Sequence, residues 1–355
     1  MTDPNVLLLI DDDSDFLAEL KEEVKRRLQG DGFVETWSPS RDEKPRDVLD
    51  AYIQDNVVLV VTDDDLTGNG LTGLFGATVV DWCQRKQVPV AIFSRRLTDD
   101  QRPDLFDMVV SASTAGTAAE EIVVTFEGFV KVWEVLSGTS LTELSGPAEA
   151  AAVALGDPQL ESELALYTAK LFAANSVLGS IGATQSHDPD EHLRLLVYVV
   201  GHILRNVVLP YPGPIIGESV LGAYLCTTTE EAERLSAFFE EAGYIGPFAA
   251  GRTYWRDKVD DILASLAEGL DESTYETFPQ FCRAIVERRL GRELARHECE
   301  RCGGEYGGFF CPFTVRAVCR RDDCSVDTNS WIPQAADLTR TEREYFDEWQ
   351  SFLGF

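Results

Sequence analysis

Short, continuous apolar runs alternate with helical patterns over the first third of the chain. Four runs of strand length are NVLLLI (5–10), NVVLVV (56–61), VPVAIF (88–93) and FDMVV (106–110). Apolar residues at helical spacing predict three helices, at residues 14–28, 76–86 and 118–136. Continuous apolar strands that alternate with amphipathic helices are typical of a parallel sheet covered on both faces. We therefore expect an α/β domain over residues 1–136.

The remainder of the chain is organised differently. Residues 137–158 are rich in Gly, Ser, Pro and Ala, which predicts a linker. Residues 159–292 have mainly helical patterns, and residues 219–257 within them resemble a winged helix, with two helices, a short turn and a hairpin. Residues 293–355 carry five of the eight cysteines and end in an amphipathic helical pattern. The sequence thus predicts a mainly helical domain followed by a small C-terminal module.

Acidic residues follow two of the predicted strands. Asp11, Asp12 and Asp13 come directly after the first run, and Asp63, Asp64 and Asp65 follow the second. If these strands are neighbours in a parallel sheet, their carboxyl ends meet at one edge and the carboxylates converge. Mg²⁺ is a hard cation that binds carboxylate oxygens, so it would stabilise such a cluster. The third run ends at Ser94, whose hydroxyl could reach an oxyanion beside the cation.

The segments LLLIDDD, VVTDDDL and PVAIFSRR, in this order, resemble the receiver domain of two-component response regulators. The resemblance covers roughly residues 4–136. It implies a five-stranded, doubly wound parallel fold and a place in a phosphorelay. It also implies that Asp11, Asp12 and Asp63 hold Mg²⁺, that Asp63 accepts the phosphoryl group, and that Ser94 is the switch hydroxyl.

The chain departs from the receiver pattern at one position that matters for chemistry. Receivers have a lysine at the end of the fifth strand, and Ser111 stands there in this chain. The lysine makes a charge-assisted contact with the phosphoryl group, so its loss weakens that contact. Two hypotheses stay open: a working receiver phosphorylated at Asp63, or a pseudo-receiver whose acids form a metal site or a solvated strand edge.

The C-terminal cysteines have the spacing of a metal site. Cys299 and Cys302 are separated by two residues, Cys319 and Cys324 by four, and sixteen residues lie between the pairs. Two cysteine-bearing turns around a short hairpin supply the tetrahedral thiolates that structural Zn²⁺ uses. Cys311 and His297 are alternative ligands. Four cysteine ligands would leave no open coordination position, so we expect a structural zinc.

The overall charge restricts the kinds of partner. The chain of 355 residues has 61 Asp and Glu against 31 Lys and Arg, a formal net charge of −30. Such a charge argues against sequence-independent binding to nucleic acid or to an anionic membrane. The most apolar segment, LRLLVYVVGHIL, is shorter than the ~20 residues that cross a bilayer, and the N-terminus has no signal-peptide pattern. We therefore expect a cytoplasmic protein.

These expectations favour a regulatory or signalling protein rather than an enzyme. Its receiver-like domain would act through contacts with other proteins, such as a histidine kinase or a larger complex, and phosphorylation of Asp63 would modulate those contacts. One alternative is a transcription regulator that binds DNA through the zinc module or the winged-helix-like part. Another is a Mg²⁺-dependent phosphohydrolase that uses the acidic cluster. The chain contains no Walker loop, nucleophile elbow or dinucleotide-binding fingerprint.

Overall fold

The computed structural model describes most of the chain. The described residues are 5–28, 32–40, 44–68, 74–94, 108–111, 114–141, 144–174, 188–297, 299, 301–304, 308–327 and 332–351. They form two compact units. The first unit comprises Met1–Glu161, Phe172–Asn206 and Gly246–Phe248, and the second comprises Ser162–Leu171, Val207–Ile245 and Ala249–Phe355.

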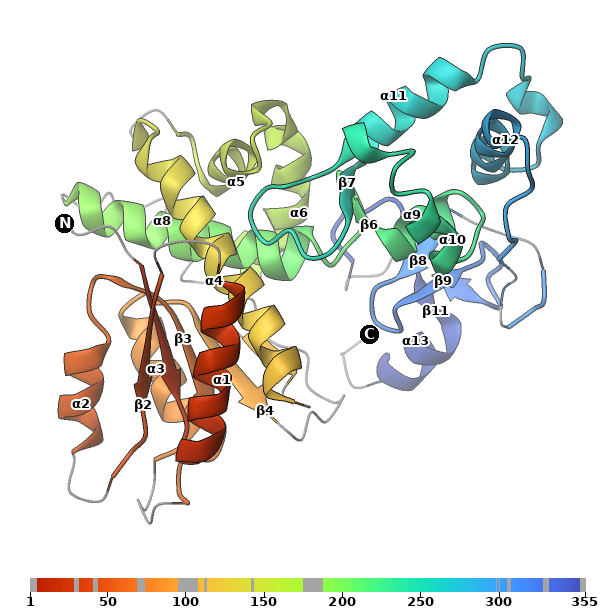
Figure 1. Ribbon diagram of the computed structural model, residues 1–355. Helices are drawn as coiled ribbons and strands as arrows, with labels where there is room; N and C mark the ends of the chain where they lie inside the picture. The colour runs from red at the N-terminus through yellow and green to blue at the C-terminus, as the bar shows by residue number, and fades with distance from the viewer. Residues whose placement is uncertain are drawn as a thin grey trace. The chain divides into compact units, whose positions relative to one another are not determined.

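A five-stranded parallel sheet forms the centre of the first unit (Figure 1). Its strands are β1 (Val6–Ile10), β2 (Phe33–Trp37), β3 (Val57–Asp63), β4 (Val90–Ser94) and β5 (Met108–Ser111). The order across the sheet is β2-β1-β3-β4-β5, which is receiver-like in topology. Every residue of β1 is buried, as its continuous apolar run predicts. The prediction of an α/β fold with a parallel sheet is confirmed.

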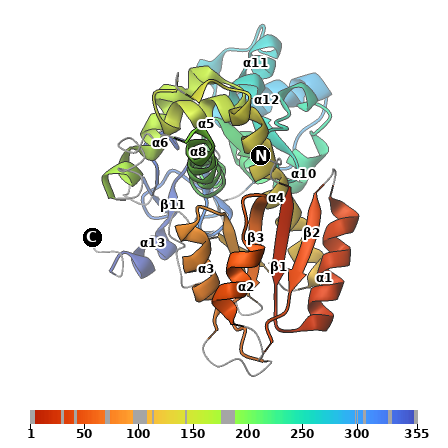
Figure 2. The ribbon, with the colours of Figure 1, turned by 90° about the vertical axis from the view of Figure 1, so that its left-hand side faces the viewer.

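Helices cover both faces of this sheet. They are α1 (Ser14–Arg27), α2 (Pro45–Tyr52), α3 (Gly76–Arg85) and α4 (Ala115–Ser137). Helices α1 and α4 pack against each other, whereas α2 and α3 share an apolar core with Leu8 and Ile10 of β1. In Figure 2 the strands run between α3 on one side and α1 on the other. The side chain of Asp13 caps α1 by accepting hydrogen bonds from the N–H groups of Asp15 and Phe16.

Two elements of the sheet domain have no clear signal in the hydrophobic pattern. Strand β2 lies at the edge of the sheet and buries Val34 and Trp37, while Phe33 is 60% exposed. With two of its five residues buried, β2 shows neither a continuous apolar run nor a strict alternation. Helix α2 is short and buries Leu49 alone.

The first unit extends beyond the sheet through further helices. These are α5 (Pro147–Leu155), a 3₁₀ turn (Pro158–Leu160), α8 (Pro189–Ile203) and a π-helical turn (Leu204–Val208) that continues from it. Helix α4 packs against both α5 and α8. Helix α5 lies in the segment predicted to be a linker, and most of its alanines are buried. The alanine content there therefore reflects close helix packing. The domain boundaries at residues 136, 158 and 292 stay predictions.

The second unit contains the segment predicted to resemble a winged helix. Its elements are β6 (Ile215–Gly217), α9 (Glu218–Tyr224), α10 (Thr229–Arg234), a 3₁₀ turn (Glu240–Ala242) and β7 (Thr253–Trp255). Strands β6 and β7 are antiparallel, and Gly243 forms a further antiparallel bridge with Tyr254. The segment thus contains a helix, a short turn, a second helix and a hairpin, in the predicted order. Helices α6 (Glu161–Ala174), α11 (Arg256–Leu266) and α12 (Phe278–Leu290) and a 3₁₀ turn (Glu272–Thr274) complete the helical part.

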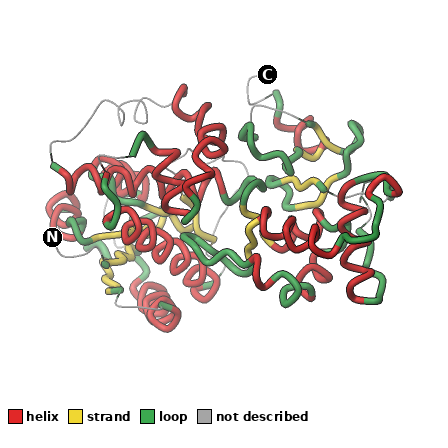
Figure 3. Tube along the Cα trace, turned by 90° about the horizontal axis from the view of Figure 1, so that it is seen from above, coloured by secondary structure: helices red, strands yellow, loops and turns green. Residues whose placement is uncertain are grey.

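Short strands form the C-terminal part of the second unit, among helices and loops (Figure 3). Strands β8 (Phe309–Cys311) and β9 (Arg316–Val318) form one antiparallel pair, and β10 (Ser325–Val326) and β11 (Thr341–Glu342) form another. The terminal helix is α13 (Arg343–Trp349). None of the helices in the described ranges is both long and apolar enough to cross a lipid bilayer.

Candidate functional site

Three carboxylates converge at the carboxyl edge of the parallel sheet. Strands β1 and β3 are hydrogen-bonded neighbours, with Ile10 paired to Thr62. This register places Asp11 and Asp12, which follow β1, beside Asp63 at the end of β3. One oxygen from each carboxylate lies within 4.8 Å of the other two. The three carboxylates therefore lie close together, as expected if β1 and β3 are neighbours.

Asp11 is the most deeply buried member of this group, at 1% exposure. Its Oδ1 accepts a hydrogen bond of 2.8 Å from the N–H of Asp13. Its Oδ2 is buried and has no hydrogen-bond partner among the described residues. Burial raises the pKa of Asp11 to about 7; the Asp13 N–H opposes this rise, and the charges of Asp63 and Asp12 add to it. An unsatisfied buried acceptor costs about 1–3 kcal/mol, and more when charged, so this oxygen favours a cation.

Asp63, Asp64 and Asp65 occupy different environments. Asp63 is half-buried and belongs to the carboxylate group, and its Oδ1 accepts a hydrogen bond of 2.8 Å from the N–H of Asp64. Asp64 and Asp65 are exposed. Asp65 Oδ1 accepts from both the N–H and the hydroxyl of Thr67, at 3.1 and 2.5 Å, and so forms a local turn. Of the three, Asp63 alone reaches the group with Asp11 and Asp12.

Two glycines allow the backbone to approach these aspartates closely. A Cβ atom at Gly76, the first residue of α3, would collide with the carbonyl oxygen of Asp63. A Cβ at Gly68 would collide with the carboxylate of Asp12, which accepts a hydrogen bond from the Gly68 N–H. The sequence shows several glycines in this loop, but their spacing does not reveal which of them need the missing side chain.

The resemblance places a switch hydroxyl at Ser94 and a missing lysine at Ser111. Strand β4 ends at Ser94, which pairs with Ser111 at the end of β5, so both backbones lie at the same edge. The side chain of Ser94 lies outside the described part of the structure. The N–H of Ser111 donates to Glu121 Oε2 of α4 at 3.1 Å. The end of β5 is thus bound to a carboxylate.

An arginine on a distant part of the chain completes this contact. Arg205, in the π-helical turn after α8, donates to Glu121 Oε1 from Nη2 at 3.0 Å and to Thr125 Oγ1 from Nε at 3.2 Å. Its side chain is 18% exposed. The sequence pattern does not reveal Glu121 and Arg205, because they are 84 positions apart and neither belongs to a motif.

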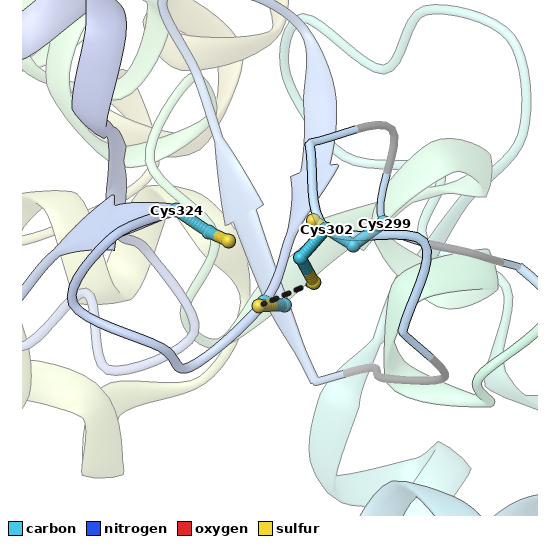
Figure 4. Close-up of side chains that lie close together, drawn as sticks. Cys299, Cys302 and Cys324 are labelled. Atoms are coloured by element: carbon cyan, nitrogen blue, oxygen red, sulfur yellow. Dashed lines mark hydrogen bonds between the residues drawn. The ribbon is translucent and has the colours of Figure 1, made fainter.

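Four cysteine sulfurs gather in the second unit. The Sγ atoms of Cys299, Cys302, Cys319 and Cys324 all lie within 4.8 Å of one another. Figure 4 shows Cys302 and Cys324 with their sulfurs directed toward a common centre, and its dashed line marks the 3.8 Å separation of Cys302 Sγ and Cys319 Sγ. A tetrahedral zinc with Zn–S bonds of ~2.3 Å places its sulfurs ~3.8 Å apart. This group can hold a metal ion and is consistent with structural zinc.

Tight turns position the cysteines on both sides of the β8–β9 hairpin. The N–H of Gly303 donates to the carbonyl of Cys299 at 2.7 Å, and the N–H of Cys299 donates to the carbonyl of Gly304 at 2.9 Å. A hydrogen bond from Gly304, with help from the neighbouring thiols, lowers the pKa of Cys302 to about 7. Burial raises the pKa of Cys324. A thiolate and thiols held this close together form a preorganised donor set for a soft cation.

The two alternative zinc ligands lie outside this group. Cys311 is fully buried on β8, and its Sγ accepts a hydrogen bond of 3.3 Å from the N–H of Glu342. His297 lines a separate cavity of about 170 Å³, together with Thr227 and Arg316. The predicted choice of Cys299, Cys302, Cys319 and Cys324 as the clustered donors therefore agrees with the geometry.

The likeness to receiver domains rests on the sheet and on the placement of the acids. The order β2-β1-β3-β4-β5 and the carboxylate group of Asp11, Asp12 and Asp63 both conform to the predicted pattern. Comparison of the chain with protein-family models, with curated proteins and with solved structures finds no match.

Proposed function

We propose that this chain is a signalling protein whose receiver-like domain binds Mg²⁺ and accepts a phosphoryl group on Asp63, and which acts by contacting other proteins. The observation that carries the proposal is the buried, unpartnered Oδ2 of Asp11 beside Asp12 and Asp63. Mg²⁺ binds a few carboxylate oxygens and keeps several waters, which suits a cluster that is buried at Asp11 and half-buried at Asp12 and Asp63. The cation would offset the repulsion among the three charges.

Asp63 is the carboxylate of this group best suited to accept a phosphoryl group. It stands at the end of β3 and is less buried than Asp11, so a phosphodonor can reach it. With acetyl phosphate, a carboxylate oxygen of Asp63 would form the new P–O bond and acetate would leave with the electrons of the broken bond. In a phosphorelay the donor would be a phosphohistidine of a partner kinase. Added charge at Asp63 would then bias contacts with a partner.

The environment of Ser111 affects how firmly a phosphoryl group would be held. Its N–H already donates to Glu121, which is also paired with Arg205. At the end of β5, where a receiver has a lysine, this chain therefore has Ser111 bound to the carboxylate of Glu121. We expect the phosphorylated form to depend on Mg²⁺ more strongly than in a receiver with the lysine, because the cation is then the main counter-charge.

Beryllofluoride, a phosphoryl mimic, provides the test. In the presence of Mg²⁺ it should slow amide hydrogen exchange at the ends of β1, β3 and β4 in the wild-type protein. Asp63→Asn should abolish the effect. Asp64→Asn is the matched control: it removes an exposed neighbouring carboxylate, and the effect should persist. No change in the wild type, or the same change in Asp63→Asn, would overturn the proposal.

The cysteine group supports a second, structural part of the proposal. We infer that Cys299, Cys302, Cys319 and Cys324 bind one Zn²⁺ as thiolates and thereby fix the β8–β9 hairpin. Four sulfur ligands leave no open position for a substrate, so this zinc stabilises the fold.

A further inference from the structure

A groove with a volume of about 350 Å³ crosses the winged-helix-like part of the second unit. It lies between β6, α10 and the segment that precedes β7. Its apolar wall includes Pro210, Pro212 and Val220. Its polar wall includes Glu218, Glu233 and Arg252. The groove therefore combines an apolar surface with a site for a cation.

The guanidinium of Arg252 already occupies the cation site. Its Nη1 lies 3.5 Å from Glu218 Oε1 and donates a hydrogen bond of 3.0 Å to the carbonyl oxygen of Glu233. The Arg252 side chain is 57% exposed, whereas that of Glu218 is 24% exposed. An exposed ion pair contributes little to stability, so exchanging this guanidinium for another cation costs little. Arg252 thus shows how an arginine of another chain would be bound.

The surrounding surface has the charge that attracts such a group. Exposed acidic residues on α10 and on the turn that follows it are Glu230, Glu233, Glu240 and Glu241. Arg234 is the basic residue of α10, and its guanidinium lies 3.2 Å from Glu231. In a winged helix that binds DNA, the corresponding helix lies in the major groove between two rows of phosphate groups, which would repel this acidic surface. A positively charged protein segment is instead attracted and steered toward it.

We propose that this groove is the docking site for a basic peptide segment of a partner protein. One arginine of the segment displaces Arg252 and takes its place against Glu218 and the Glu233 carbonyl. An apolar residue next to that arginine packs on the exposed Pro210 and on the half-buried Leu209 before it. The inference deepens the proposed function, since it names the kind of partner, but it does not depend on Mg²⁺ or on phosphorylation of Asp63.

The test uses the full chain and a fluorescein-labelled peptide, Gly-Leu-Arg-Leu-Arg-Gly, with fluorescence anisotropy at about 0.15 M salt, where the Debye length is about 8 Å. Arg252→Ala should strengthen binding several-fold, because it removes the internal competitor. Arg234→Ala, the matched control, removes a positive charge from the same surface outside the groove and should change binding less than twofold. Glu218→Gln should weaken binding about tenfold, and Glu240→Gln should change it less than twofold.

Several outcomes would overturn this inference. Equal effects of Arg252→Ala and Arg234→Ala, or of Glu218→Gln and Glu240→Gln, would mean that the peptide responds only to overall charge. Absence of binding to folded wild-type protein, or stronger binding of a DNA duplex than of the peptide, would also overturn it. Thermal unfolding confirms that each variant is folded. The beryllofluoride experiment is made at a different site, so failure here leaves the proposed role of Asp63 standing.

Discussion

Arg205 and Glu121 form an ion pair of 3.0 Å that joins the turn after α8 to helix α4. The second oxygen of the Glu121 carboxylate accepts a hydrogen bond from the N–H of Ser111. One carboxylate thus links the end of β5, the following helix α4, and a turn 84 positions farther along the chain. In the family that this domain resembles, a lysine at the strand end would point to the phosphoryl group. Here the end of β5 is instead hydrogen-bonded to helix α4 through Ser111 and Glu121.

Removing Arg205 should destabilise the first unit. Arg205→Met keeps much of the apolar stem but leaves Glu121 without its guanidinium partner, and we expect a loss of about 1–2 kcal/mol in the free energy of unfolding. Urea unfolding measures this loss. Arg85→Met is the control, because its pair with Asp81 is exposed at 70% and 59%, and its loss should stay below about 0.5 kcal/mol. Equal losses in the two variants would contradict the structural role given to Arg205.

Asp11 should make the metal-free protein less stable as the pH rises. Its pKa is about 7 in the folded state against 3.8 in the unfolded chain. Between these values the folded state retains a proton that the unfolded state has lost, so the stabilising contribution is complete below pH 3.8 and is lost as the pH rises through 7. Asp11→Asn should remove this slope and also the stabilisation by Mg²⁺. Asp64→Asn should keep both, as followed by thermal unfolding with and without Mg²⁺.

His202 should give a slope of the opposite sign. It is fully buried between Tyr198 and Phe129, and burial lowers its pKa from 6.5 to about 4. Between pH 4 and 6.5 the unfolded chain binds the extra proton, so stability falls as the pH drops through this window. The full change is on the order of 3 kcal/mol. In His202→Gln the acid-side loss should shrink, and an unchanged pH profile would count against a buried neutral imidazole.

The zinc assignment predicts a metal content that depends on particular thiols. We expect one zinc per chain by elemental analysis, and loss of that zinc in Cys302→Ser and in Cys319→Ser. Cys311→Ser is the matched control: Cys311 is equally close in sequence but its sulfur lies outside the group, so zinc content should be unchanged. A strong chelator should lower the melting temperature of the wild type. Less than half an equivalent of zinc in freshly purified protein would defeat the assignment.

Gly76 should tolerate no side chain. Gly76→Ala places a Cβ against the backbone of Asp63 and Asp64, which cannot move aside without shifting β3 or α3. We expect a destabilisation of about 2 kcal/mol or more, together with a loss of the beryllofluoride response. Gly116→Ala, in the first turn of α4, is the control: its Cβ would make only ordinary contacts at 3.8 Å, so stability should not fall.

The sheet domain shows which features a hydrophobic pattern reveals. The central strands β1 and β3 are buried almost throughout, so each is a continuous apolar run. Strand β5 is an edge strand in which Val109 is 38% exposed, but its sequence is also an apolar run. Once these runs are identified, Asp11 and Asp63 are predicted to meet if β1 and β3 are neighbours. Strand β2 is not predicted because it buries only Val34 and Trp37, and its residues Phe33 and Glu35 are exposed. The cysteine group is visible because its donors are close in sequence. The Glu121–Arg205 pair, the two close glycines and the Arg252 contact have no such signal, since each depends on how distant segments pack.

Helix α4 runs unbroken from Ala115 to Ser137, 23 residues and thus roughly 35 Å. It begins near Ser111, packs against α1, and farther along contacts α5 and α8. Because α4 has no break at which it could bend, a displacement of its first turn moves the whole helix as a rigid body. A tilt of about 5° about its first turn would shift its far end by about 3 Å. A sub-ångström adjustment at the strand ends would thereby become a displacement large enough to alter packing between α4 and its neighbours.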